Sequence, residues 1–154
     1  MKGDATVIEH LNKVLRNELT AINQYFLHSR IYKDWGVAKL GKHEFEESVD
    51  EMKHADQLIE RILFLEGQPN MQSLGKLRIG KDVKEIIQCD LDLELDAIPD
   101  LRAAIAYCEN HKDYASRELF DSILISEEEH VDFLETQLSL IDKVGIENYI
   151  QSQT

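Results

Sequence analysis

Residues 67–81 have the sequence GQPNMQSLGKLRIGK and separate two pairs of segments with helical periodicity. On both sides, apolar residues recur at intervals of three and four, the spacing that places them on one face of a helix. These 15 residues extend to about 50 Å, whereas a helix over the preceding segment, from about Lys39 to Glu66, is about 40 Å long. The connection is therefore long enough to run the length of a helix bundle and to start the next helix at the opposite end.

Four long helices and one short helix are expected around this connection. They span about Ala5–Trp35, Lys39–Glu66, Asp82–Asn110, Asp113–Lys143 and Ile146–Gln153. Asp4 is the expected N-cap of the first helix, and Gly36, Gly67 and Gly145 are expected to end the first, second and fourth. About three residues join the first helix to the second, and the third to the fourth, so each pair is predicted to form an antiparallel hairpin.

Pro99 falls inside the third expected helix. An interior proline removes a backbone hydrogen bond at a cost of about 3 kcal/mol. Apolar periodicity continues on both sides, from Ile87 and Leu91 to Leu101 and Ile105, so we expect one kinked helix. The chain is thus predicted to be an all-α, ferritin-like four-helix bundle over residues 1–154, a single domain with one long crossover between helices two and three and a short C-terminal fifth helix.

The composition excludes several classes of partner. The chain carries 17 basic and 30 acidic residues, a net charge of −13, which opposes binding to nucleic acid or an anionic membrane and favours attraction of cations. The charge-free stretch Leu19–Ser29 is shorter than the roughly 20 residues that cross a bilayer. An acid at Asp4 and the absence of an apolar N-terminal region argue against a signal peptide, so a cytoplasmic protein is expected.

Acidic residues occur on the faces that should form the core. Two Glu-x-x-His motifs, Glu51–His54 and Glu127–His130, each place a carboxylate and an imidazole on one helix face. Apolar residues at helical spacing surround both motifs, and they also surround Glu18 and Glu94. Burying isolated carboxylates costs several kcal/mol each, so a compensating charge is required.

Two metal ions would supply that charge. Glu18 and Glu51 lie 33 residues apart, as do Glu94 and Glu127, so each predicted hairpin contributes one Glu and one Glu-x-x-His. Four carboxylates and two imidazoles are a ligand set for two iron or manganese ions, and this pattern is known from ferritin-like di-iron bundles. The candidate metal ligands, which are also the candidate catalytic residues, are Glu18, Glu51, His54, Glu94, Glu127 and His130.

Several longer segments carry a resemblance to a known family. They are MKGD (1–4), NELTAINQYFLHSR (17–30), DEMKHAD (50–56), ERILFLEG (60–67) and GIENYIQSQ (145–153). With these segments the chain resembles the bacterioferritins from end to end. The resemblance implies iron storage and detoxification: an intrasubunit di-iron ferroxidase centre, ferric mineral inside a homo-oligomeric cage of twenty-four subunits built from two-fold dimers, haem b shared between two subunits, and a ferredoxin as reductant for iron release.

The resemblance also implies individual roles. Glu51 and Glu127 would bridge the two irons, the other two acids would be terminal ligands, and each histidine would bind one iron. Tyr25 resembles the family's tyrosine near this centre; a core aromatic with a satisfied hydroxyl is the alternative. Met52 resembles the axial haem ligand, and it lies about 100° round the helix from Glu51 on a second apolar stripe with Phe45. Two apolar faces on one helix predict a subunit interface.

Some positions depart from the family pattern or have no clear partner. Relatives often have histidine where this chain has Glu46, which with Glu47 and Asp50 forms either an inner-surface iron site or a solvated acidic face. Phe133 replaces a tryptophan common in relatives, so a radical role there is in doubt. The remaining histidines are expected to be surface or hydrogen-bonded residues; they are His10, His28, His43 and His111.

Two other functions remain alternatives to the ferroxidase. One is a haem-binding structural cage subunit without its own ferroxidase activity, and the presence of all six candidate ligands argues against it. The other is a di-iron oxygenase or peroxidase acting on a small molecule. Such relatives need a substrate pocket or a redox module, and the two cysteines, Cys89 and Cys108, form no CxxC motif. The oxidant of the ferroxidase, dioxygen or hydrogen peroxide, is left open.

Overall fold

The computed structural model describes residues 1–154 and consists of helices and their connections. The helices are α1 (Ala5–Asp34), α2 (Ala38–Phe64), α3 (Val83–Asn110), α4 (Tyr114–Val144) and α5 (Ile146–Ser152). The all-α prediction is confirmed, and each boundary lies within two residues of the expected one. The helices are too short or too polar to span a bilayer.

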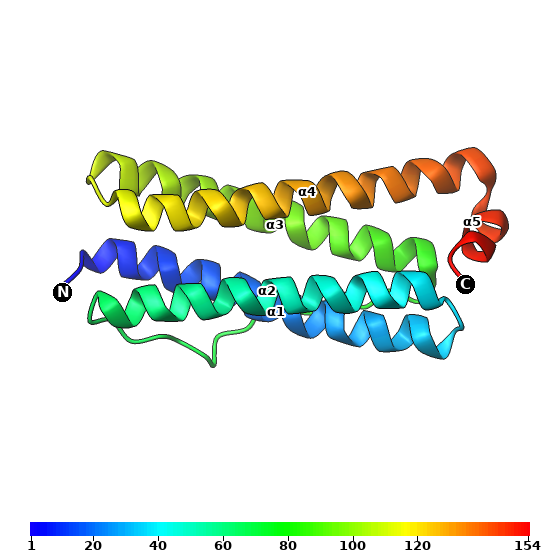
Figure 1. Ribbon diagram of the computed structural model, residues 1–154, viewed down its shortest axis with the longest axis horizontal. Helices are drawn as coiled ribbons and strands as arrows, with labels where there is room; N and C mark the ends of the chain where they lie inside the picture. Colours follow the sequence, from blue (N-terminus) through cyan, green and yellow to red (C-terminus); the bar gives the residue numbers. More distant parts are fainter.

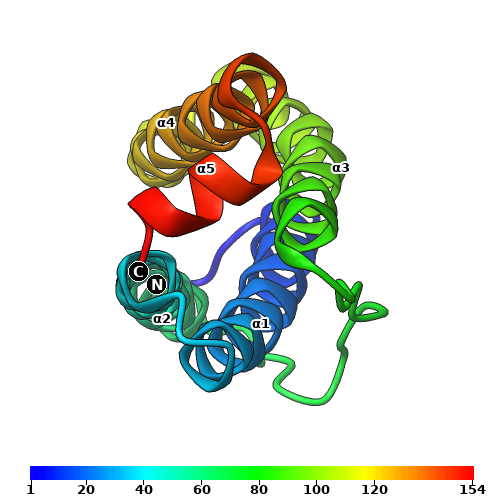
Figure 2. The ribbon, with the colours of Figure 1, turned by 90° about the vertical axis from the view of Figure 1, so that its right-hand side faces the viewer.

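The four long helices form a bundle of two antiparallel hairpins. In Figure 1, α1 and α2 lie together along one side of the bundle, and α3 and α4 lie along the other. The connection after α2 runs back along the bundle, so α3 begins at the end opposite to the one where α2 finishes. Figure 2 shows α5 lying across one end of the four helices. This arrangement is the ferritin-like bundle with a single long crossover.

The crossover is attached to α1 by polar side chains. Four residues of α1 form hydrogen bonds with the backbone of the crossover: Asn12, Thr20, Gln24 and His28. They are spaced by four or eight residues, so they form one polar stripe along the helix. The Gly80 N–H donates to His28 Nε2 at 3.1 Å, and a Cβ at Gly80 would lie 2.4 Å from the backbone nitrogen of Ile86. Glycine is therefore required where the crossover meets α3.

Most helix ends follow the expected signals, and one does not. The Asp4 side chain caps α1 by accepting from the backbone N–H groups of residues 6 and 7, and α4 ends at Gly145, whose φ is 85°. The prediction that Gly67 ends the second helix was wrong in detail, because Glu66 takes the left-handed conformation, with φ 63°. Helix α3 continues through Pro99 as one element, as the apolar periodicity predicts.

The apolar core is divided into two clusters along the bundle. One contains residues near the N-terminus of α1 and the C-terminus of α2, such as Leu11 and Leu58. The other lies toward α5 and contains Tyr32 and Leu134. Between them, in sequence order along every long helix, lie the buried acids of the candidate metal centre. The fold therefore places a charged layer between two dehydrated apolar layers.

Candidate metal centre

All six candidate ligands lie in this charged middle layer. Glu18 comes from α1, Glu51 and His54 from α2, Glu94 from α3, and Glu127 and His130 from α4. The four glutamates and His130 are at most 3 % exposed, while the His54 side chain is 13 % exposed. Each residue lies on the apolar stripe of its helix, and packing of the four stripes brings residues from different helices, 33 to 112 positions apart, into one cluster.

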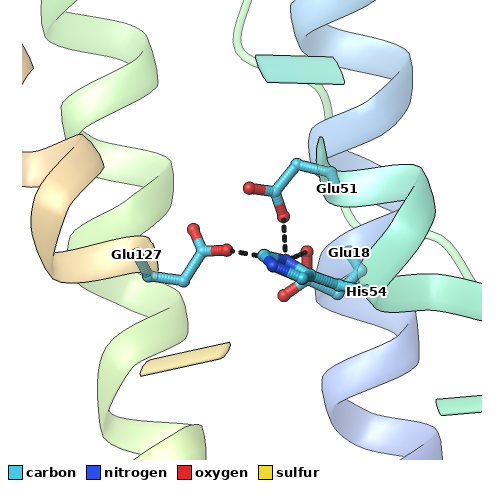
Figure 3. Close-up of side chains that lie close together, drawn as sticks. All are labelled: Glu18, Glu51, His54 and Glu127. Atoms are coloured by element: carbon cyan, nitrogen blue, oxygen red, sulfur yellow. Dashed lines mark ion pairs between the residues drawn. The ribbon is translucent and has the colours of Figure 1, made fainter. Parts of the chain in front are cut away.

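One half of the cluster surrounds His54. Its Nδ1 lies 3.5 Å from Glu18 Oε2, 3.7 Å from Glu51 Oε2 and 3.4 Å from Glu127 Oε1. Figure 3 shows the carboxylates of Glu51 and Glu127 pointing toward the imidazole from opposite helices. One ligand atom from each of these four residues lies within 4.8 Å of the others, so the four side chains can surround a single ion.

The other half of the cluster surrounds His130. Its Nδ1 lies 3.4 Å from Glu94 Oε1, and one ligand atom each from Glu51, Glu94, Glu127 and His130 again falls within 4.8 Å of the others. Glu51 and Glu127 belong to both halves. A carboxylate has two oxygens, so each of these two residues could offer one ligand atom to each group.

Tyr25 lies at the wall of the His130 half. It is fully buried, its hydroxyl donates to Glu94 Oε1, and its ring meets the His130 imidazole edge to face, with centroids 5.1 Å apart. Tyr25 was expected either to lie near the metal centre or to be a core aromatic with a satisfied hydroxyl. It is a core aromatic, and the partner that satisfies its hydroxyl is a candidate ligand.

The carboxyl groups differ in their tendency to ionise. Burial raises the pKa of Glu127 well above its usual range, and the nearby charges of Glu94 and Glu51 raise it further. Burial also acts to raise the pKa of Glu94, but hydrogen bonds with Glu127, His130 and Tyr25 outweigh it, and the pKa is lowered. Without metal, ionisation is therefore favoured at Glu94 and opposed at Glu127 and, through burial, at Glu51.

The histidine of this half is charged under the same conditions. Burial lowers the pKa of His130, yet the hydrogen bond and charge of Glu94 outweigh burial and raise it to about 9. Protons thus neutralise the metal-free cluster in part. Six buried ligand atoms still lack a hydrogen-bond partner, one on each candidate ligand. Such atoms carry an energetic cost that a bound cation would remove, so the donor set fits a pair of divalent or trivalent ions.

A second buried polar cluster lies beside the first. Atoms of His28, Glu44 and Asp90 approach within 4.8 Å of one another. His28 Nε2 accepts from the Gly80 N–H, so its other nitrogen, Nδ1, carries the proton and donates to Asp90 Oδ1 at 2.9 Å. Both ring nitrogens are occupied, and we interpret this cluster as a structural network that holds the crossover.

The sequence contained a signal for this network. Glu44 lies two helical turns before Glu51, and Asp90 lies one turn before Glu94, so both share the core stripe of a candidate ligand. We expected His28 to be a surface or hydrogen-bonded residue, and it is completely buried and hydrogen-bonded. The sequence analysis singled out only the acids whose spacing matched between the two hairpins, so it missed Glu44 and Asp90, the two carboxylate partners of His28.

The other predicted functional residues lie outside the buried centre. Met52 is 56 % exposed and occupies a different face of α2 from Glu51, two helical turns after the exposed Phe45. The Phe45 ring in turn meets Phe26 of α1, with centroids 6.3 Å apart. The predicted second apolar face therefore exists. Glu46 and Asp50 are exposed, and the Asp50 carboxylate pairs with Lys53 at 3.8 Å.

Comparison with known proteins identifies the chain's relatives. The pattern of the Ferritin family, described as a ferritin-like domain, matches residues 8–144. A bacterioferritin of Rhodobacter capsulatus is 54% identical over 149 residues, which cover 97% of this chain and 92% of that protein. A bacterioferritin of Brucella melitensis biotype 1 is 52% identical over 151 residues, 98% and 94% of the two chains. A bacterial ferritin of Synechocystis sp. is 50% identical over 154 residues, 99% of each chain.

Proposed function

We propose that this chain, which belongs to the bacterioferritin family of ferritin-like proteins, stores iron by oxidising Fe(II) at its buried cluster and holding the ferric product inside a cage of identical subunits. The observation that carries the proposal is the pair of four-residue groups that share Glu51 and Glu127. A structural ion-pair network would balance acids with Lys or Arg. This one leaves ligand atoms without partners and offers a place for two cations.

In this proposal, the six residues divide into shared and terminal ligands. Glu51 and Glu127 contact both ferrous ions, while Glu18 and His54 complete one side. Glu94 and its partner His130 complete the other side. The ferrous ions are the substrate, and dioxygen or hydrogen peroxide takes electrons from them in chemistry that the metal supplies.

The protein side chains position the ions, supply negative charge and exclude water. Apolar clusters on both sides exclude water from the layer, which strengthens the attraction between the carboxylates and a cation. Protons held on Glu127 and His130 leave when the ions enter, because a ligand atom must be deprotonated to bind. The Tyr25 hydroxyl donates a hydrogen bond to Glu94 and thereby orients this terminal ligand in the His130 half of the cluster.

The net charge of −13 suits a protein that concentrates cations around itself. We infer an assembly of twenty-four subunits built from two-fold dimers, with the exposed apolar face of α1 and α2 as the dimer contact. A large exposed apolar face on a soluble chain is typical of a subunit interface. Phe26, Phe45, Met52 and Leu63 are all exposed on these two helices, and each is available to pack against a second subunit.

Met52 fits a haem on this face. Its thioether is a soft donor, and it is exposed on a helix that also exposes Phe45 and Leu63. A two-fold axis passing near it would bring a second Met52 into the same site, so one b-type haem would be held by two subunits. When bound, the haem would supply electron transfer from a reductant such as a ferredoxin to the stored iron.

Anaerobic addition of Fe(II), followed by air, tests the oxidation step. The wild-type protein is expected to oxidise about two irons per subunit in a rapid first phase. Replacement of both shared carboxylates, Glu51→Ala and Glu127→Ala, is expected to abolish that phase. Glu60→Ala with Glu128→Ala removes the same number of acids from exposed positions of the same two helices and serves as the control. An unchanged first phase in the buried double variant would refute the site.

A further inference from the structure

Asp90 is the acceptor that anchors the last part of the crossover to the bundle. Its Oδ1 accepts from Gln24 Nε2 at 2.9 Å and from His28 Nδ1 at 2.9 Å. The same two side chains accept from the crossover: Gln24 Oε1 accepts from the Arg78 N–H at 2.9 Å, and His28 Nε2 accepts from the Gly80 N–H at 3.1 Å. Two backbone groups of the crossover therefore depend on one carboxylate oxygen of α3.

The same carboxyl group also meets Glu44 of α2. Glu44 lies within hydrogen-bonding reach of Asp90, and the two residues are 3 % and 1 % exposed. Neither Glu44 Oε1 nor Asp90 Oδ2 has a hydrogen-bond partner, and His28 Nδ1, which is 3.7 Å from Glu44 Oε1, already donates to Asp90. Two carboxylates in contact at a dry site cannot both be ionised, so one proton between them is the missing donor.

We propose that the proton shared by Glu44 and Asp90 is a pH-operated latch that keeps the crossover closed on α1. While the proton is present, Glu44 donates to Asp90 and leaves Asp90 Oδ1 to hold Gln24 and His28. When the proton is lost, two negative charges meet in a dehydrated site, and water that enters beneath the crossover relieves their repulsion. The protonated pair is therefore the closed state, and rising pH opens it.

The surroundings of Glu44 offer no cation that could take the place of the proton. Burial raises the pKa of Glu44 well above its usual range, and neighbouring acids raise it further. The titratable groups that face it are His28 and Tyr32 of α1, Glu47 of α2, and Asp90 and Glu94 of α3. His28 cannot take up a second proton at Nε2 without losing the Gly80 N–H, so the shared proton is what neutralises the pair.

The crossover is a thin cover over this network. Gly80 is the only buried residue of the crossover, residues 67–81, and its neighbours Ile79 and Lys81 are both exposed. Glycine has no side chain that could seal His28 from solvent, and the close approach of Ile86 leaves no room for one. Water therefore has a short route to the carboxyl pair once the hydrogen bond between Gly80 and His28 breaks.

Backbone hydrogen exchange of the assembled protein, read by mass spectrometry with fragmentation to single amides, tests the latch. An opening that releases one proton becomes more frequent by up to about tenfold per pH unit, so the Gly80 and Arg78 amides should exchange progressively faster between about pH 6 and about pH 9, after correction for intrinsic exchange. Gly75 is the internal reference. Its N–H donates to Thr20 Oγ1 at 2.8 Å, without any link to Asp90, so its corrected rate should stay constant.

Two variants remove the shared proton in different ways. Glu44→Gln keeps a donor to Asp90 that cannot ionise, and Asp90→Asn keeps the acceptor oxygen and removes the charge. Each should make the corrected exchange of Gly80 independent of pH, whereas Glu46→Gln, which changes an exposed acid of the same helix, should behave like wild type. A pH-independent Gly80 amide in wild type, a parallel rise at Gly75, or a rise that persists in both buried variants would overturn the latch. The wild-type comparison of Gly80 with Gly75 decides the matter even where a variant fails to fold.

Discussion

Glu94 and Glu127 face the same cluster, yet neutral replacement is expected to affect them very differently. In the metal-free protein, Glu127 is the protonated member of the pair, because its pKa is raised by burial and by neighbouring charges. Glu127→Gln therefore exchanges one neutral group for another of nearly the same shape. Glu94 is ionised and accepts from Tyr25, so Glu94→Gln removes a buried charge on which its neighbours depend.

The size of the difference follows from His130. Burial lowers its pKa, but Glu94 and the other acids outweigh burial and raise it from 6.5 to about 9. One pKa unit corresponds to about 1.4 kcal/mol, so the net stabilisation by these acids, after the cost of burial, is about 3 kcal/mol. Because the folded-state pKa lies above the unfolded value, this stabilisation is complete below pH 6.5 and is lost as the pH rises toward about 9. We expect Glu94→Gln to lose most of it and Glu127→Gln to change stability by less than about 1 kcal/mol.

Thermal unfolding of the metal-free proteins, followed by far-ultraviolet circular dichroism at one protein concentration, measures this difference. For a chain of this size, about 3 kcal/mol corresponds to a Tm lower by roughly 6–12 °C. The gap between wild type and Glu94→Gln should be widest near pH 6 and should narrow as the pH approaches 9. Equal losses in the two variants, or a larger loss in Glu127→Gln, would refute the assignment of the proton to Glu127.

Three further predictions concern the metal, the haem and the crossover. Zn(II) should raise the Tm of the metal-free protein and release protons, by mass action at a site whose ligands must deprotonate; a pH-stat and a melting curve measure both. Met52→Leu keeps the apolar volume, so the variant should assemble and oxidise iron but lose the haem absorption band; a normal haem spectrum would place the axial ligand elsewhere. His28→Ala leaves the Gly80 N–H without a partner and removes one of the two donors to Asp90 Oδ1, the other being Gln24; it should cost about 2–4 kcal/mol, measured by denaturant unfolding.

The sequence was sufficient to predict the bundle because its signals are local. Apolar periodicity, Asp4 and Gly145 mark the helices to within two residues. The length of residues 67–81 gives the connectivity, because a short loop would have forced α3 to start beside the end of α2. Glu66 was missed because the left-handed residue at a helix end is usually glycine, and Gly67 was the nearest candidate.

The residues of the centre could also be predicted from local signals, but the differences between their pKa values could not. Each acid can be identified from its own helix alone, because it lies on the apolar stripe of that helix. The contrast between Glu94 and Glu127 depends on contacts across the bundle, where Tyr25 of α1 reaches Glu94 of α3. The His43 ring of α2 likewise lies 6.4 Å, centroid to centroid, from the His130 ring of α4, and no spacing within one helix encodes this proximity.

The placement of the charged layer links folding to metal binding. Apolar clusters on either side position Glu18, Glu51, Glu94 and Glu127 before any ion is present, so the bundle does not need metal to form its core. The four carboxylates repel one another when ionised, and protons on Glu127 and His130 relieve that repulsion in the metal-free protein. In the proposed centre, a metal pair would replace those protons with stronger positive charge at the same positions. Protons and metal therefore compete for one set of atoms, and acidification that favours the protonated cluster must weaken metal binding. The dry core supplies the rigidity, the ionised carboxylates supply the attraction for a cation, and the protons that must leave set the pH dependence of binding.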